Sequence, residues 1–299
     1  MSTVLPVHAP ISFEGSAPRA LLIALAGFAA MYVPVYWWAA GTIWQSDEHA
    51  HGAIVLAVAV WLFWGLRGAI TEAPLAPSPV LGSLLFGLGL LVYVVGRLFS
   101  ISIFELGSQI PVIAGGLLLL KGPAALRAAW FPIFYLIFMI PLPGLLVDAI
   151  TGPLKQWIST IVVSLLYAVG YPIAQSGVIL SIGQYQLLVA DACSGLHSMF
   201  SLTALGTLFM YIMARPGRLH NAIMLASILP IAFIANICRV IVLVLVTYHL
   251  GDEAGQGFLH GAAGFVLMLV ALAIFFALDW ALSVALPSPI RRAGAQGKR

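Results

Sequence analysis

The sequence predicts an all-α polytopic membrane protein with about eight transmembrane helices and an extracytoplasmic cap between the fifth and sixth. Of its 299 residues, 62% are hydrophobic and only 8% are charged, whereas a soluble domain carries roughly 25% charged residues. The net charge of +3, from 13 basic and 10 acidic residues, comes without any long basic run. This composition excludes a disordered chain, a disulfide-rich secreted domain and a nucleic-acid binder.

A helix needs about 20 mostly apolar residues to cross about 30 Å of hydrocarbon. The expected spans lie near residues 20–40, 52–66, 80–95, 102–120, 126–142, 194–214, 219–248 and 258–285. The first nineteen residues lack the short basic-then-apolar build of a cleaved signal peptide, so we expect the first span to remain as a signal anchor. The whole chain, 1–299, then forms one membrane domain with five N-terminal spans (20–142), a cap (143–192), three C-terminal spans (193–285) and a tail (286–299).

Charge sets the expected orientation. With the N-terminus in the cytoplasm, alternation of the spans places every basic residue except Arg97, Lys155 and Arg239 on the cytoplasmic side. Cytoplasmic segments of membrane proteins carry an excess of Lys and Arg. We therefore predict that both termini are cytoplasmic.

The cap is expected from residues 143–192, which must begin and end outside. Within it, 154–170 is apolar but interrupted by lysine, glutamine, serine and threonine. This pattern favours an amphipathic helix in the outer interface or a re-entrant element, and a spanning helix stays open as an alternative. The β-branched run 177–190 around Gly183 predicts a small β-hairpin.

Three side chains with chemical potential share one predicted depth. Cys193 begins the sixth span and His260 begins the eighth. Arg239 lies 20 residues beyond residue 219, which at 1.5 Å per residue is about 30 Å from the inner start of the seventh span. An Arg at mid-bilayer costs about 2.5–3.5 kcal/mol, so an ionisable residue in a span is a functional candidate.

A thiol, an imidazole and a guanidinium suffice for acyl transfer. A cationic neighbour favours the nucleophilic thiolate of a cysteine. Histidine can protonate a leaving amine, and arginine can stabilise the developing oxyanion. Asn236 shares a helix face with Arg239 and is placed to aim its guanidinium. The glycines of the eighth span predict a smooth face that admits a neighbouring backbone near His260: Gly257, Gly261 and Gly264.

Other assignments stay open. A single membrane cysteine often only packs, which is how we interpret Cys238. Ser194 would be the nucleophile of a serine enzyme, although no Gly-x-Ser-x-Gly elbow is present. His197, one turn after Cys193, is an alternative base or a channel-lining residue. The carboxylates and imidazoles of 47–51 are close enough for a metal site, yet an exposed loop explains them equally well, so we predict no metal and no cofactor.

The order of these blocks resembles the exosortase family of bacterial membrane enzymes, to which archaeosortases are related. The blocks are Asp191-Ala-Cys193-Ser-Gly195-Leu, Ala235-Asn236-Ile-Cys-Arg239-Val and Phe258-Leu-His260-Gly. Family members carry a cysteine motif, an Asn-x-x-Arg block and a late histidine in this order. His51, which follows an acidic outer loop, is similar to a family feature near the second span. His197 is a departure, because many relatives carry Arg there, and we expect any C-terminal soluble domain to be supplied by another protein.

The resemblance implies a cysteine protease or transpeptidase that cleaves C-terminal sorting signals of the PEP-CTERM type, built of a small motif, a hydrophobic helix and a basic tail. On this hypothesis Cys193 attacks the substrate and forms a thioester acyl-enzyme, with Arg239 and His260 assisting. The implied partners are membrane-tethered substrate proteins, the lipid bilayer and an amine or glycolipid acceptor.

The implied location is the bacterial inner membrane, with a periplasmic active site and a link to exopolysaccharide and the biofilm matrix. An alternative from another class is a non-enzymatic transporter or assembly component for lipid-linked sugars. In that alternative Arg239 and His260 bind a phosphate, and Cys193 only packs.

Overall fold

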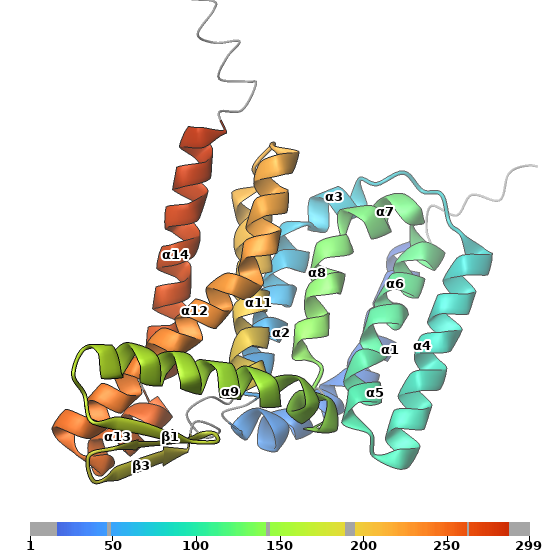
Figure 1. Ribbon diagram of the computed structural model, residues 1–299. Helices are drawn as coiled ribbons and strands as arrows, with labels where there is room; N and C mark the ends of the chain where they lie inside the picture. Colours follow the sequence, from blue (N-terminus) through green and yellow to red (C-terminus); the bar gives the residue numbers. More distant parts are fainter. Residues whose placement is uncertain (1–16, 47–48, 142–143, 189–194, 262, 287–299) are drawn as a thin grey trace, which may run out of the picture. The chain divides into compact units, whose positions relative to one another are not determined.

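Helices account for 81% of the structure, a computed structural model that describes residues 17–46, 49–141, 144–188, 195–261 and 263–286 (Figure 1). The chain divides into two compact units. The N-terminal unit comprises Met1–Ile43 and Phe63–Ile133, and the C-terminal unit comprises Trp44–Leu62 and Phe134–Arg299.

Apolar helices occupy all the stretches where spans are expected. Five described helices are long and apolar enough to cross a membrane: Leu22–Gln45, Pro79–Phe99, Ser102–Leu120, Arg218–Leu250 and Gly264–Ala285. The remaining stretches contain shorter apolar helices: His51–Gly65, Trp130–Met139 and Phe200–Met213. The chain is therefore a multi-pass membrane protein, and five of the eight expected spans meet the criteria of length and hydropathy among the described residues.

In the N-terminal unit, glycine holds two helices in close contact. The unit contains α1 (Ala17–Gly41), α3 (Arg67–Thr71), α4 (Pro79–Phe99), α5 (Ser102–Gly107), α6 (Gln109–Leu120) and α7 (Pro123–Ala128). Three glycines at seven-residue spacing, Gly82, Gly89 and Gly96, are buried on α4. A Cβ atom at Gly89 would lie 2.6 Å from Val112 Cγ2 of α6. Small residues of this kind allow helix backbones to approach within a membrane.

A buried polar network joins α1 to the start of α6. The hydroxyls of Tyr32 and Ser108 are 2.8 Å apart, and Tyr36 donates a hydrogen bond to Oε1 of Gln109. Tyr32, Ser108 and Gln109 are fully buried. These hydrogen bonds satisfy polar groups that lipid would leave unpaired.

Two expected spans are divided into shorter helices, and proline explains both divisions. The stretch 102–120 forms α5 and α6, because Pro111 has no N–H to donate to the carbonyl of Gly107, where α5 ends. The stretch 126–142 forms α7, α8 (Trp130–Tyr135) and the 3₁₀ helix η2 (Leu136–Met139). Here Pro132 cannot donate to the carbonyl of Ala128, where α7 ends.

The C-terminal unit has a first core made by three helices: α11 (Gly195–Met213), α12 (Arg218–Leu250) and α14 (Ala263–Ala285). Leu202 of α11, Ile228 of α12 and Phe275 of α14 are almost fully buried in this core. We call this arrangement the bundle core. Its α12 contacts come from the first half of the helix, up to Ala235.

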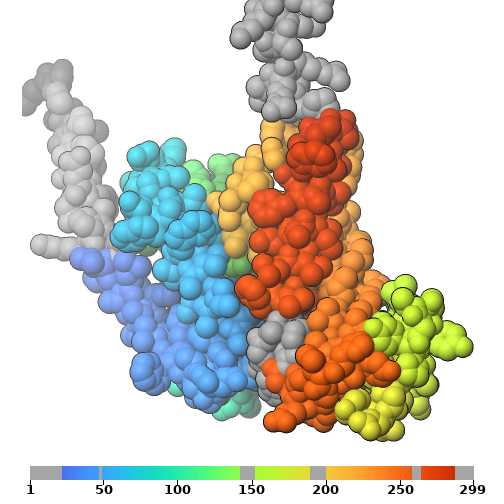
Figure 2. All heavy atoms as spheres, turned by 90° about the vertical axis from the view of Figure 1, so that its left-hand side faces the viewer, coloured from blue at the N-terminus to red at the C-terminus, as the bar shows by residue number. Residues whose placement is uncertain are grey.

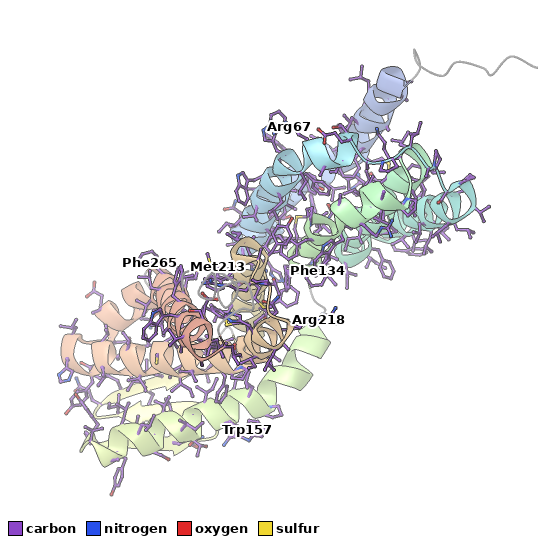
Figure 3. All side chains as sticks on the ribbon, turned by 90° about the horizontal axis from the view of Figure 1, so that it is seen from above. Arg67, Phe134, Trp157, Met213, Arg218 and Phe265 are labelled. Carbon is purple, nitrogen blue, oxygen red and sulfur yellow. The ribbon has the colours of Figure 1, made fainter. Side chains whose placement is uncertain are left out.

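The second core of this unit lies between α9 (Gly144–Ala168), a small sheet and the second half of α12. Ile158 and Val162 of α9 pack with Leu180 of the sheet and with Val240 and Val244 of α12. We call this arrangement the cap core. Figure 1 shows α9 running across the axes of α11 and α14, and Trp157 of α9 points away from α12 in Figure 3. The helix therefore has one buried and one exposed face, as an amphipathic helix requires.

The sheet corrects the expected hairpin. It has three antiparallel strands in the order β1 (Ile173–Ser176), β2 (Ile179–Ile182) and β3 (Tyr185–Leu188). The two turns contain Gly177 and Gly183, with φ of 64° and 56°, a backbone region that glycine enters at little cost. The expectation missed β1, which precedes residue 177.

The expected last span, 258–285, is also too long at its start. The structure has a separate helix, α13 (Asp252–Gly261), before α14. In Figures 1 and 2, α13 lies beside the strands at the far end of α12 from Arg218. His260 therefore belongs to α13 and does not open the spanning helix.

Candidate active site

The C-terminal unit contains every site residue expected from the sequence. Cys193, Ser194 and Asp191 lie outside the described residues. His197 is in the first turn of α11, and His260 is near the end of α13. Arg239 and Asn236 lie on α12, which packs against both α11 and α13. A fifth expected site residue, His51, begins α2 (His51–Gly65), so five expected site residues lie in described helices of this unit.

Arg239 is buried where the two cores of this unit meet. Its neighbour Ala235 belongs to the bundle core and Val240 belongs to the cap core. Only 7% of Arg239 is exposed. Arg239 lies 21 residues after Arg218, about 31 Å along α12 at 1.5 Å per residue. A guanidinium that is kept out of water at this depth has a strong electrostatic influence on its surroundings, because the local dielectric is low.

Asn236 lies one helical turn before Arg239 and is fully buried. Its Nδ2 and Oδ1 atoms have no hydrogen-bond partner among the described residues. The structure therefore lacks the expected hydrogen bond in which Asn236 aims the guanidinium of Arg239. Both residues share a helix face, as the three-residue spacing predicted.

His51 lies near the N-terminal end of α11. Its ring makes an edge-on contact with Phe200, with 6.3 Å between the ring centroids, and Phe200 in turn contacts Phe138. Phe200 is three residues after His197, which places the two on the same face of α11. The structure thus brings His51 close to the helix that follows Cys193.

The acidic loop before α2 is described only in part. Asp47 and Glu48 lie outside the described residues. Ser46 Oγ and His49 Nδ1 are 3.2 Å apart. Beside this loop, Gly52 packs so closely on Trp44 that a Cβ atom would lie 2.3 Å from the indole nitrogen. The described residues therefore give the loop a packing role at the start of α2.

Close packing of α13 depends on a glycine that the sequence did not single out. A Cβ atom at Gly255 would lie 2.1 Å from Thr247 Oγ1 of α12, whereas Gly257 and Gly264 have nothing within 4 Å. Among the described residues, no neighbour makes the close approach at Gly257 or Gly264 that the smooth face would permit. The contact of Gly255 with Thr247 sets the distance between α13 and α12. This distance determines the position of the helix that carries His260.

A second polar cluster, remote from these residues, was also missed. Asp279 of α14 accepts a 3.1 Å hydrogen bond from Nε of Arg215 and a further one from Nη2 of the same side chain. Nε2 of His220 lies 2.9 Å from Oδ1 of Asp279. Hydrogen bonding to Asp279 raises the pKa of Arg215, which lies in the connection after α11. A buried carboxylate in an apolar helix was the available signal, and the cluster fastens α14 to the α11–α12 connection and to the start of α12.

A family model described as transmembrane exosortase matches residues 37–277. No curated protein and no solved structure matches the chain. In general, exosortases are membrane-embedded cysteine transpeptidases or proteases that act on membrane-associated proteins with sorting signals. Because the match covers most of the sequence, including the whole region from Cys193 to His260, the chain belongs to the transmembrane exosortase family.

Proposed function

We propose that this protein cleaves C-terminal sorting signals of the PEP-CTERM type at the outer face of a bacterial inner membrane, using Cys193 as its nucleophile. The observation that carries this proposal is the family match over 37–277, which contains the cysteine, arginine and histidine blocks together. The burial of Arg239 at the meeting of the two cores supports it, because an arginine in an apolar helix normally extends its charged end toward the headgroups.

The proposed reaction has two steps. The thiolate of Cys193 attacks the scissile carbonyl, and Arg239 stabilises the negative charge that develops on the carbonyl oxygen. His260 donates a proton to the leaving amine as the C–N bond breaks, which leaves the N-terminal part of the substrate on Cys193 as a thioester. Water or an amine acceptor then takes the acyl group and regenerates the thiol.

We further propose that eight spans cross the membrane and that α9 with the sheet forms the periplasmic cap. The 33 residues of α12 extend about 50 Å, longer than the roughly 30 Å of the hydrocarbon. The part of α12 that packs against the cap core is its second half. If Arg218 marks the inner boundary, the cap core lies beyond the outer boundary and Arg239 lies at that boundary. Processing there would supply proteins to the exopolysaccharide or biofilm matrix.

The test pairs the enzyme in cells with a reporter that ends in a PEP-type signal. Cys193→Ala and His260→Ala should abolish the cleaved band at matched expression. Arg239→Lys should reduce cleavage about 10²–10³-fold, because lysine keeps the charge but loses the fork of donors. Cys238→Ala, in α12, is the matched cysteine control. His249→Ala, at an exposed position near the end of α12, is the histidine control.

Both controls should cleave as the wild type does. Persistent cleavage by Cys193→Ala would overturn the thiol mechanism, and loss of the band on Ser194→Ala alone would favour a serine enzyme. Absence of cleavage by the wild-type chain would contradict the proposed function and favour the transporter alternative.

A further inference from the structure

Asn236 is buried without a polar partner. Its side chain has no exposed surface, and neither Nδ2 nor Oδ1 has a hydrogen-bond partner within the described part of the chain. Two other buried polar side chains of the same unit are satisfied, since Ser159 donates to the carbonyl of Lys155 and His220 pairs with Asp279. Thr247 Oγ1 also has no partner among the described residues, but Asn236 lacks partners for both its donor and its acceptor atom. An amide that is orphaned on both its donor and its acceptor side opposes folding.

The unsatisfied amide of Asn236 lies next to a residue of the proposed active site. It lies one turn before Arg239 on the same face of α12, between the bundle core and the cap core. Residues at this spacing have Cβ atoms about 5–6 Å apart. An extended peptide advances about 3.3–3.6 Å per residue, so a substrate whose scissile carbonyl faces Arg239 brings a peptide group one or two residues away to Asn236.

We propose that Asn236 binds the backbone of one substrate residue beside the scissile bond, with Nδ2 donating to the C=O of that residue and Oδ1 accepting from its N–H. The proposal rests on the proposed function. An amide side chain matches the backbone of an extended residue, because the N–H and C=O of such a residue point to the same side and the amide carries both an acceptor and donors. This pairing is independent of the substrate side chain, so Asn236 positions the backbone and leaves sequence selection to other residues.

Burial adds a conformational consequence. Because Asn236 has no exposed surface in the free chain, the substrate reaches it only after the covering side chains move aside. The free enzyme is therefore closed around Asn236, and the hydrogen bonds gained on binding offset the opening.

The first experiment compares Asn236→Leu with the wild type in purified, membrane-reconstituted protein. Leucine has a similar volume and no polar atom, so the melting temperature should rise by about 2 °C or more. The value of kcat/KM for a sorting-signal peptide should fall about tenfold to hundredfold, as expected for one or two lost hydrogen bonds. Gln109→Leu, a buried amide to leucine change in the N-terminal unit, is the matched control and should leave kcat/KM unchanged.

The second experiment identifies the partner of Asn236. In the substrate, one backbone N–H beside the scissile bond is replaced by an ester oxygen, at each of the two nearest positions on either side. At one position the replacement should lower kcat/KM about tenfold for the wild type, and by less than twofold for Asn236→Leu.

The outcomes separate this inference from the proposed function. A lower melting temperature with unchanged kcat/KM in Asn236→Leu would show a structural role and overturn the inference alone. Equal ester effects in both enzymes would also overturn it. Absence of any cleavage by the wild-type chain would overturn the proposed function, and this inference with it.

Discussion

The close contact between Gly255 and Thr247 predicts that a single methyl group at residue 255 displaces α13 from α12 and slows cleavage. In Gly255→Ala the new Cβ atom would lie 2.1 Å from Thr247 Oγ1, about 1.3 Å short of an ordinary contact of 3.4 Å. Either the Thr247 side chain turns or α13 moves by about 1 Å. Overpacking of this kind costs about 1–3 kcal/mol, and a 1 Å misplacement of reacting groups can cost about 10²-fold in rate.

Two further variants make the prediction specific. Gly257→Ala is the matched control, because no described residue has an atom within 4 Å of its Cβ position and alanine favours a helix over glycine by about 1 kcal/mol. In the double variant Gly255→Ala with Thr247→Ala, the nearest remaining atom is the Cβ of residue 247 at 3.1 Å. This variant should recover part of the lost cleavage.

The assay is cleavage of the sorting-signal reporter, with thermal unfolding measured in parallel. We expect Gly255→Ala to cleave about 10²-fold more slowly, Gly257→Ala to cleave normally and the double variant to be intermediate. Equal cleavage by Gly255→Ala and Gly257→Ala would refute the reasoning that this contact places the helix of His260.

Three further predictions concern stability and are each checked by thermal unfolding in a defined detergent or lipid. Asp279→Ala leaves Arg215 and His220 without their carboxylate, and should cost about 1.5–3 kcal/mol, the range for hydrogen bonds to charged groups; an unchanged melting temperature would contradict a stabilising cluster. Gly89→Leu should force α4 and α6 apart and prevent accumulation of folded protein, whereas Gly87→Leu, with nothing within 4 Å, should be tolerated; equal yields would refute the glycine interface. Leu180→Ala should cost about 2–5 kcal/mol, because Leu180 is fully buried in the cap core; a loss below 1 kcal/mol would show that the cap core packs loosely.

Much of the architecture follows from the sequence because hydropathy is a strong signal. Long apolar runs predicted the positions of the helices, and the polar interruptions of 154–170 predicted the amphipathic character of α9. The boundaries were harder, since the divisions at Gly107 and Ala128 depend on single prolines within otherwise continuous apolar runs. The position of Pro132 could have predicted the second division.

The remaining misses have local causes. The four residues of β1 are too few to show a clear alternation, and only pairing with β2 makes them a strand. The packing of α13 on α12 depends on Gly255 against Thr247, which no local pattern indicates. Asn236 and Arg239 could be selected in advance because amide and guanidinium groups are rare and costly in apolar helices. Their burial between two cores required the fold.

The most direct test of the central claim is detection of the acyl-enzyme. The enzyme is mixed with substrate in the absence of an amine acceptor, the reaction is quenched with acid, and its cysteine peptides are analysed by mass spectrometry. We predict that Cys193 carries the N-terminal part of the substrate as an adduct that neutral hydroxylamine removes, and that Cys238 stays unmodified. Cleavage of the substrate with no adduct on Cys193, together with full activity of Cys193→Ala, would contradict the proposed mechanism.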